Sequence, residues 1–237
     1  QVSYVIFGIM ILTPQGLSGA LLQVIFHAIA KNALFLAAGA IIYKTGAIYV
    51  KDLKGMGKKM PIVMWCFTIA SLSLIGIPPT GGFVAKWDLA VGALSPEFGG
   101  VLGYVGPAIL LVSALLTAGY LLPIVRDAFF PGKDFDYETL EKKEANAYMT
   151  VPLILLCIGV VGLGMFPRGL QQVINGITSA VNNFFDANNQ WAVTLFGREY
   201  SWSVIISGIL LTIFTALVLI GGLKRISSVA QVIVPFM

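Results

Sequence analysis

Long apolar stretches separated by short polar segments dominate this chain of 237 residues. A helix needs about 20 residues to cross an apolar core about 30 Å thick. Stretches near this length predict membrane-spanning helices at residues 17–43, 61–77, 101–130, 151–166 and 203–223. Two shorter apolar stretches, residues 2–12 and 83–94, predict the end of one helix and half of another. The pattern therefore predicts an all-α polytopic membrane protein with about six or seven membrane segments.

One of these segments is predicted to be a broken helix near residues 76–100. The apolar stretch from Pro61 is interrupted by the run Pro78-Pro79-Thr80-Gly81-Gly82. Proline cannot continue a helix and glycine favours turns, so we expect Pro78, Pro79, Gly81 and Gly82 to form the break. Half-helices around a break expose backbone ends at membrane depth, where transporters place ion sites.

The C-terminal third has a different pattern. Residues 169–186 repeat apolar positions at helical spacing with amides between them, which predicts an amphipathic helix in the plane of the membrane interface. We expect a single membrane domain, residues 1–237. It divides into a helical unit (1–130), a charged loop (131–150) and trailing helices (151–237).

Composition supports a membrane location. The chain is 57% hydrophobic and 11% charged, whereas soluble proteins have about 25% charged residues. The formal net charge of +4 comes mostly from predicted loops, so it does not indicate nucleic-acid binding. Cys66 and Cys157 stand singly, without the CxxC spacing of metal sites, and are predicted to be buried thiols. We expect no metal or cofactor in this chain. The first apolar stretch is too short to span, so we expect a piece of a longer or split protein.

Titratable side chains inside one apolar stretch are the first candidates for function. His27 and Lys31 are four residues apart and share a helix face with Gln23. A lysine at the centre of a membrane helix costs roughly 2.5–3.5 kcal/mol on insertion scales, so such residues usually have a role. The polar stripe should face protein or water. The alternative is a set of hydrogen bonds that joins helices.

Two further candidates follow the predicted break. Lys86 lies in the second half-helix, and Asp88 is the one acid inside an apolar segment. Because they are two residues apart, they point to different faces and should not pair directly. The alternative for Lys86 is that it extends to the lipid headgroups. The proposed proton-transfer residues are thus Lys31, His27, Lys86 and Asp88.

Three motifs resemble a known family. The strings HAIAKNALF (27–35), DLKGMGKKMP (52–61) and GIPPTGGFVAK (76–86) resemble the antiporter-like membrane subunits of respiratory complex I. They equally resemble the large subunits of multi-subunit cation/proton antiporters and of membrane-bound hydrogenases. The resemblance covers about residues 1–185. It implies that residues 1–130 form the second of two inverted repeats, an antiporter-like repeat, followed by C-terminal helices.

The resemblance also implies roles. Lys31 matches the family's central-axis lysine, with His27 beside it, and Lys86 matches the ionisable residue of the second broken helix. The first repeat, with its glutamate–lysine pair, is absent from this sequence. We therefore expect charge partners from a missing N-terminal half or a second antiporter-like subunit.

Three functions remain open from the sequence. The first is a non-redox subunit that translocates H⁺ or Na⁺ within a redox-driven, multi-subunit complex of the cytoplasmic or inner organellar membrane. Its partners would be other membrane subunits and the lipid bilayer, with no nucleic acid. The second is a subunit of a cation/proton antiporter without redox chemistry. The third is a degenerate half-antiporter that acts as a structural spacer.

Overall fold

The computed structural model describes residues 1–11, 13–95, 100–132, 143–185, 192–195 and 198–201. Its α-helices are α1 (Val2–Met10), α2 (Pro14–Thr45), α3 (Met56–Lys59), α4 (Pro61–Ile75), α5 (Gly81–Leu94), α6 (Gly100–Phe129), α7 (Ala147–Met165) and α8 (Arg168–Phe185). A 3₁₀ helix, η1 (Val50–Leu53), precedes α3, and strands β1 (Ala192–Leu195) and β2 (Arg198–Ser201) form an antiparallel pair. The predicted span at 203–223 and most of the charged loop lie outside the described residues.

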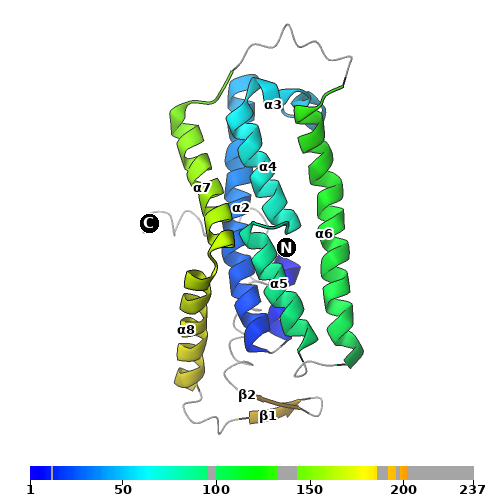
Figure 1. Ribbon diagram of the computed structural model, residues 1–237, viewed down its shortest axis with the longest axis vertical. Coiled ribbons are helices and arrows are strands. Elements are labelled where there is room, and N and C mark those ends of the chain that lie inside the picture. The colour runs from blue at the N-terminus through cyan, green and yellow to red at the C-terminus, as the bar shows by residue number, and fades with distance from the viewer. Residues whose placement is uncertain (12, 96–99, 133–142, 186–191, 196–197, 202–237) are drawn as a thin grey trace.

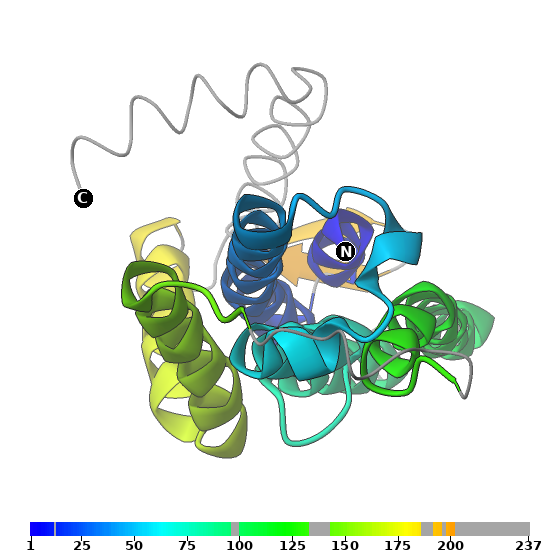
Figure 2. The same ribbon diagram turned by 90° about the horizontal axis from the view of Figure 1, so that it is seen from above.

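The helices form an elongated bundle around α2. Helices α2, α4, α6 and α7 run along the long axis, α5 continues below α4, and α8 continues below α7 (Figure 1). Helix α2 packs against α1, α4, α5, α7 and α8. Seen along the bundle, α6 and α7 lie on opposite sides of α4 (Figure 2). The helical prediction is therefore confirmed for the described residues, apart from the short β1–β2 pair.

Local sequence explains the ends of α2. The Thr13 side chain caps the first turn by accepting a hydrogen bond from the Gly16 amide at 3.0 Å. Pro14 occupies the first helical position, where its missing N–H is not needed. The helix ends at Gly46, whose φ of 71° is the left-handed conformation that terminates many helices. Residues 14–16 therefore belong to α2, three residues earlier than the sequence pattern predicts.

Helices α4 and α5 are the two halves of the predicted broken helix. They contain 15 and 14 residues, or about 22 and 21 Å, so neither spans an apolar core of about 30 Å alone. Helix α4 ends at Gly76 in a left-handed conformation, and Pro78-Pro79 is a cis peptide. One part of the prediction needs correction: Gly81 and Gly82 form the first turn of α5 instead of the break. Helix α5 can begin there because first-turn amides need no intrahelical partner.

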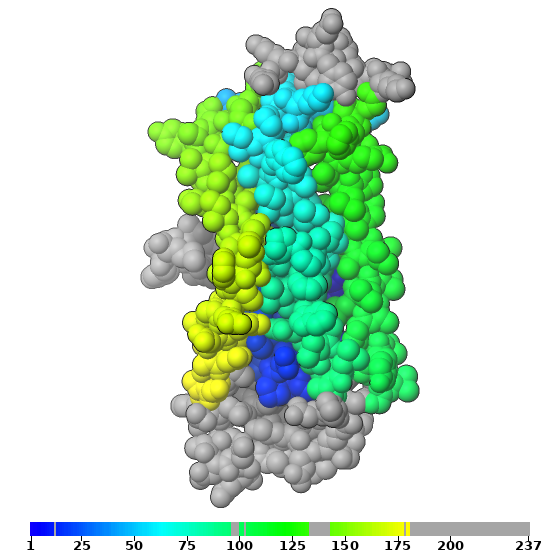
Figure 3. Space-filling model, in the orientation of Figure 1, coloured from blue at the N-terminus to red at the C-terminus, as the bar shows by residue number. Residues whose placement is uncertain are grey.

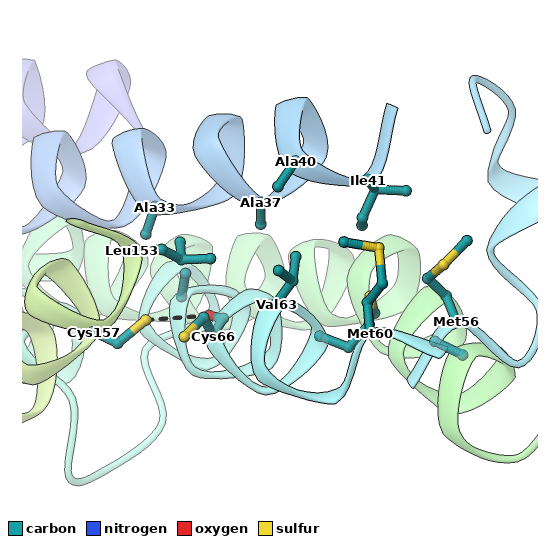
Figure 4. Close-up of a cluster of buried hydrophobic side chains, with 13 residues drawn as sticks. Ala33, Ala37, Ala40, Ile41, Met56, Met60, Val63, Cys66, Leu153 and Cys157 are labelled. Atoms are coloured by element: carbon teal, nitrogen blue, oxygen red, sulfur yellow. Dashed lines mark hydrogen bonds between the residues drawn. The ribbon is translucent and has the colours of Figure 1, made fainter. Parts of the chain in front are cut away.

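The upper half of the bundle has a core of small and sulfur-containing side chains (Figure 4). Ala33, Ala37 and Ala40 on α2 are fully buried, and such small residues let membrane helices approach closely. Cys66 and Cys157 are buried free thiols, as predicted, and the Cys157 thiol donates to the Cys66 carbonyl at 3.5 Å. This core fixes α2, α4 and α7 against one another above the helix break.

The outer surfaces suit an apolar environment. Three described helices are long and apolar enough to cross a membrane: Pro14–Thr45, Gly103–Phe129 and Ala147–Met165. Helix α6 exposes large apolar side chains along its length, among them Val101, Leu111, Leu115 and Leu116. These three helices correspond to three of the expected membrane segments within the described residues.

Helix α8 packs its apolar face on the bundle. Its Ile174 is 2% exposed and packs with Leu22, Phe26 and Ala85 on α2 and α5. It matches the predicted amphipathic helix over 169–186, and it runs along the bundle beside these helices (Figure 1). An apolar stripe can be buried either in the membrane interface or against neighbouring helices. Sequence periodicity is the same in both cases, so it does not distinguish them.

Candidate functional site

The Lys86 side chain lies at the break between α4 and α5. It is 9% exposed, and its Nζ donates to the carbonyls of Leu74 and Ile75 at 2.7 and 2.6 Å. These carbonyls end α4, where the last four have no intrahelical partner and the helix dipole is negative. The Tyr4 ring lies 5.2 Å from the same Nζ. Lys86 thus caps the first half-helix. The alternative, in which its side chain extends to the lipid headgroups, does not agree with this arrangement.

Gly76 makes room for this lysine. Its φ is 91°, which L residues with side chains rarely adopt, and a Cβ there would lie 2.7 Å from the Lys86 Cδ. The same residue therefore ends α4 and lets the aliphatic stem of Lys86 cross the break.

A chain of hydrogen bonds connects Lys86 with α2. The Leu74 carbonyl that accepts from Lys86 also accepts from Gln1 Nε2 at 3.0 Å. Gln1 Oε1 accepts from Gln23 Nε2 on α2 at 2.7 Å. Sequence reasoning identified Gln23 and Lys86 but not the connecting Gln1 and Tyr4. Neither of these stands out in the sequence, since their role depends on α1 packing beside the break.

The predicted polar stripe on α2 changes environment along its length. Gln23 is 2% exposed, His27 is partly buried, and Lys31 is exposed with its Nζ 5.2 Å from the Phe35 ring. Gln23 Oε1 and His27 Nδ1 are buried and have no hydrogen-bond partner among the described residues. Unpaired buried polar atoms cost about 1–3 kcal/mol each, so they are rare outside functional sites. The stripe thus leads from the buried network to the outer face of α2.

Asp88 belongs to a different environment from Lys86. It is 8% exposed, and its Oδ2 accepts from Gln171 Nε2 of α8 at 3.0 Å. No Lys86–Asp88 ion pair forms, as the two-residue spacing predicted. Asp88 lines a cavity of about 460 Å³ between α8, α5 and the start of α2. The four candidate residues therefore fall into three environments: Lys86 in the hydrogen-bonded network at the break, His27 and Lys31 farther along the α2 stripe, and Asp88 beside α8.

Among the described residues, no three His, Cys, Asp or Glu side chains lie close enough together to hold a metal ion. Lys86 and Asp88 are buried and His27 is partly buried, and an amine, a carboxylate and an imidazole are groups that can hold a proton.

Sequence comparison finds relatives in membrane oxidoreductases. The profile of the family described as NADH:quinone oxidoreductase/Mrp antiporter, TM, matches residues 1–122. NADH-quinone oxidoreductase subunit N of Desulforudis audaxviator is 39% identical over 187 residues, which are 75% of this chain and 36% of that protein. The chloroplastic NAD(P)H-quinone oxidoreductase chain 4 of Chlorokybus atmophyticus is 31% identical, over 76% and 36% of the two chains. The chain thus spans about a third of the length of these relatives.

Solved structures share the fold. A chain of the Mrp complex from a Dietzia species superimposes with a TM-score of 0.65 at 24% identity, over 78% of this chain and 41% of that one. A chain of the archaeal membrane-bound sulfane sulfur reductase gives a TM-score of 0.52 at 24% identity, over 86% and 32%. A profile of the sodium:alanine symporter family matches residues 139–237, less than half of the chain, and about half of that range lies outside the described residues.

Proposed function

The chain belongs to the NADH:quinone oxidoreductase/Mrp antiporter membrane family, and we propose that it is a proton-translocating, antiporter-like subunit of a redox-driven membrane complex. Lys86, His27 and Lys31 would be its proton carriers. Redox centres would reside in partner subunits, and the complex would lie in the cytoplasmic or an inner organellar membrane. The observation that carries this proposal is Lys86, a buried amine held at the end of a broken helix and joined by hydrogen bonds to α2.

The surroundings of Lys86 suit a group that gains and loses a proton. Two helix-end carbonyls and the Tyr4 ring favour the ammonium form. Burial without a carboxylate partner among its contacts favours the neutral amine. A carrier must reach both forms, and at Lys86 one influence favours each of them.

The stripe on α2 supplies a direction for the proton. Gln1 and Gln23 can orient water or each other between the break and His27, and an imidazole can accept a proton on one nitrogen and release it from the other. Lys31 follows one turn later on the exposed face of α2. We propose that this face meets another antiporter-like subunit, which brings a carboxylate to Lys31.

The test is proton pumping by the complex that contains this chain, purified and reconstituted in liposomes. Lys86→Gln removes the carrier, and Lys86→Arg keeps the charge on a group that does not release its proton. Both should reduce pumping by an order of magnitude or more while the complex still assembles. Lys54→Gln, at an exposed lysine outside the bundle, is the matched control and should pump normally.

Other outcomes would select another function. Normal pumping in both Lys86 variants, and in a triple variant with alanine at Lys86, His27 and Lys31, would favour the structural spacer. A subunit of a non-redox cation/proton antiporter is the second candidate, because the matched family is described by both quinone oxidoreductase and Mrp antiporter. Sodium-driven proton movement in vesicles without any electron donor would support it.

A further inference from the structure

The cavity beside Asp88 is a second polar site, separate from the Lys86 network. Its floor is the start of α2, with Pro14, Gln15 and Ser18, and one wall is Asp88 on α5. Helix α8 forms the opposite wall through Gln171, Asn175 and Ser179. In Figure 3, atoms from the N-terminal part of the chain, in blue, are visible between yellow α8 and teal α5 at this end of the bundle. All the lining residues except Pro14 are polar; Ser18 and Asp88 are buried, whereas Gln15, Asn175 and Ser179 are exposed.

The arrangement of α8 explains how the cavity is kept open and polar. Gln171 and Asn175 are one turn apart and face the cavity with Ser179. On the adjoining face Ile174 packs into the apolar cluster of Leu22 and Phe26. The two faces of the helix thus have separate tasks: one attaches α8 to the bundle and the other lines the cavity.

Asp88 is the single titratable group among the described residues that line this cavity. It is more than nine-tenths buried, its Oδ2 accepts a hydrogen bond from Gln171, and among the described residues no cationic side chain forms an ion pair with it. A buried carboxylate without a cationic partner is costly unless a proton, a cation or water compensates its charge. At about 30 Å³ per molecule, the cavity volume of about 460 Å³ corresponds to roughly 15 waters.

We propose that this cavity is a hydrated access site in which Asp88 holds a monovalent cation, H⁺ or Na⁺, in exchange with one side of the membrane. Carboxylate, amide and hydroxyl oxygens are suitable ligands for hard cations. This proposal shares one assumption with the proposed function, namely that an ion crosses the membrane. It adds an acid and a helix, α8, that the Lys86 network does not include.

The experiment measures the local charge at the cavity directly. Ser18→Cys places a thiol on its floor, and small cationic and anionic methanethiosulfonate reagents are applied separately to each side of sealed vesicles containing the full complex. Both reagents should react from one side only, and the cationic reagent should react faster, on the order of tenfold after normalisation to an exposed Lys54→Cys thiol. In the Asp88→Asn background this preference should vanish. Because both reagents attack the same thiolate, their rate ratio is insensitive to the ionisation of the cysteine itself.

Two additional arms identify the cation. Replacing choline by Na⁺ at constant ionic strength should lower the ratio if Na⁺ occupies the site. Lowering the pH in choline should lower it if a proton does. Asn175→Cys is the second reporter should Ser18→Cys fail to assemble.

Three results would overturn the proposal: no reaction of either reporter cysteine, a ratio near one with Asp88 intact, or a ratio that Asp88→Asn leaves unchanged. Lys86→Gln separates this test from that of the proposed function, because it should stop pumping while the ratio persists. A persistent ratio combined with normal pumping in Lys86→Gln would refute the carrier role of Lys86 and leave the cavity site standing.

Discussion

Gly82→Ala tests the close contact between α4 and α5 that places Lys86. Gly82 is the second residue of α5, and its amide donates to the Ser73 hydroxyl on α4 at 3.3 Å. A Cβ at this position would lie 1.9 Å from the Ser73 carbonyl oxygen, whereas real Cβ contacts essentially never fall below 3.0 Å. The two half-helices would therefore have to separate by about 1 Å.

The magnitude follows from two consequences of that separation. Overpacking of this kind costs about 1–3 kcal/mol. A shift of about 1 Å would also stretch the Lys86 hydrogen bonds, now 2.7 and 2.6 Å, to the limit of useful geometry. Hydrogen bonds to charged groups contribute about 1.5–3 kcal/mol each, so we expect a total loss of about 2–4 kcal/mol, since the clash and the stretching are partly alternatives. At about 2–4 °C per kcal/mol for a chain of this size, that corresponds to a fall in Tm of about 4–16 °C.

The assay is thermal unfolding of the detergent-solubilised protein, followed by tryptophan fluorescence. Gly119→Ala on α6 and Gly39→Ala on α2 are matched controls, because a Cβ at either position meets nothing within 4 Å. They should leave Tm unchanged or raise it, since alanine favours helix over glycine by up to about 1 kcal/mol. Unfolding of Gly82→Ala at the same temperature as these controls would refute the close approach of α4 and α5. It would also refute the hydrogen bonds from Lys86 to the carbonyls of Leu74 and Ile75, which depend on that approach.

Further predictions concern other contacts in the bundle. Gly164→Ala should lower Tm, because a Cβ there would lie 2.3 Å from a backbone oxygen of the loop between α4 and α5, and Gly162→Ala, with open space, should not. Equal Tm values would contradict this contact. Thr13→Ala should cost about 1 kcal/mol in chemical unfolding by removing the cap of α2, and Thr13→Ser should restore most of it. Cys66 and Cys157, each 5% exposed, should react with a membrane-permeant maleimide only after unfolding, so rapid labelling of the folded protein would count against the core in Figure 4.

Much of the helix pattern could be predicted because membrane helices follow from apolar length and helix-breaking residues. The predicted helix over 61–77 is observed as Pro61–Ile75, and the predicted half-helix over 83–94 as Gly81–Leu94. The errors fall at the ends of the helices, because capping residues determine where a helix begins and ends. Pro14 starts a helix because Thr13 caps it, and Gly81 can enter α5 because first-turn amides need no partner.

The candidate site was predictable only as a set of residue types. A lysine in an apolar segment is costly at any orientation, so Lys86 and Lys31 stood out in the sequence. Their surroundings did not, because backbone carbonyls accept the Lys86 hydrogen bonds and every residue has one. The roles of Gln1, Tyr4 and Gln171 likewise depend on which helices are neighbours.

The sequence by itself determined that the chain forms apolar helices, that one of them is broken, and that a few titratable groups are carried into the apolar region. These properties depend on neighbours along the chain, through backbone hydrogen bonding and the cost of burying charge. The tertiary structure decided that Lys86 caps α4, that Asp88 turns to α8 instead of Lys86, and that α8 packs on the bundle. The physical reason is that burial of an apolar face is favourable against many different apolar surfaces. Which helices contact one another is therefore settled only when they pack together.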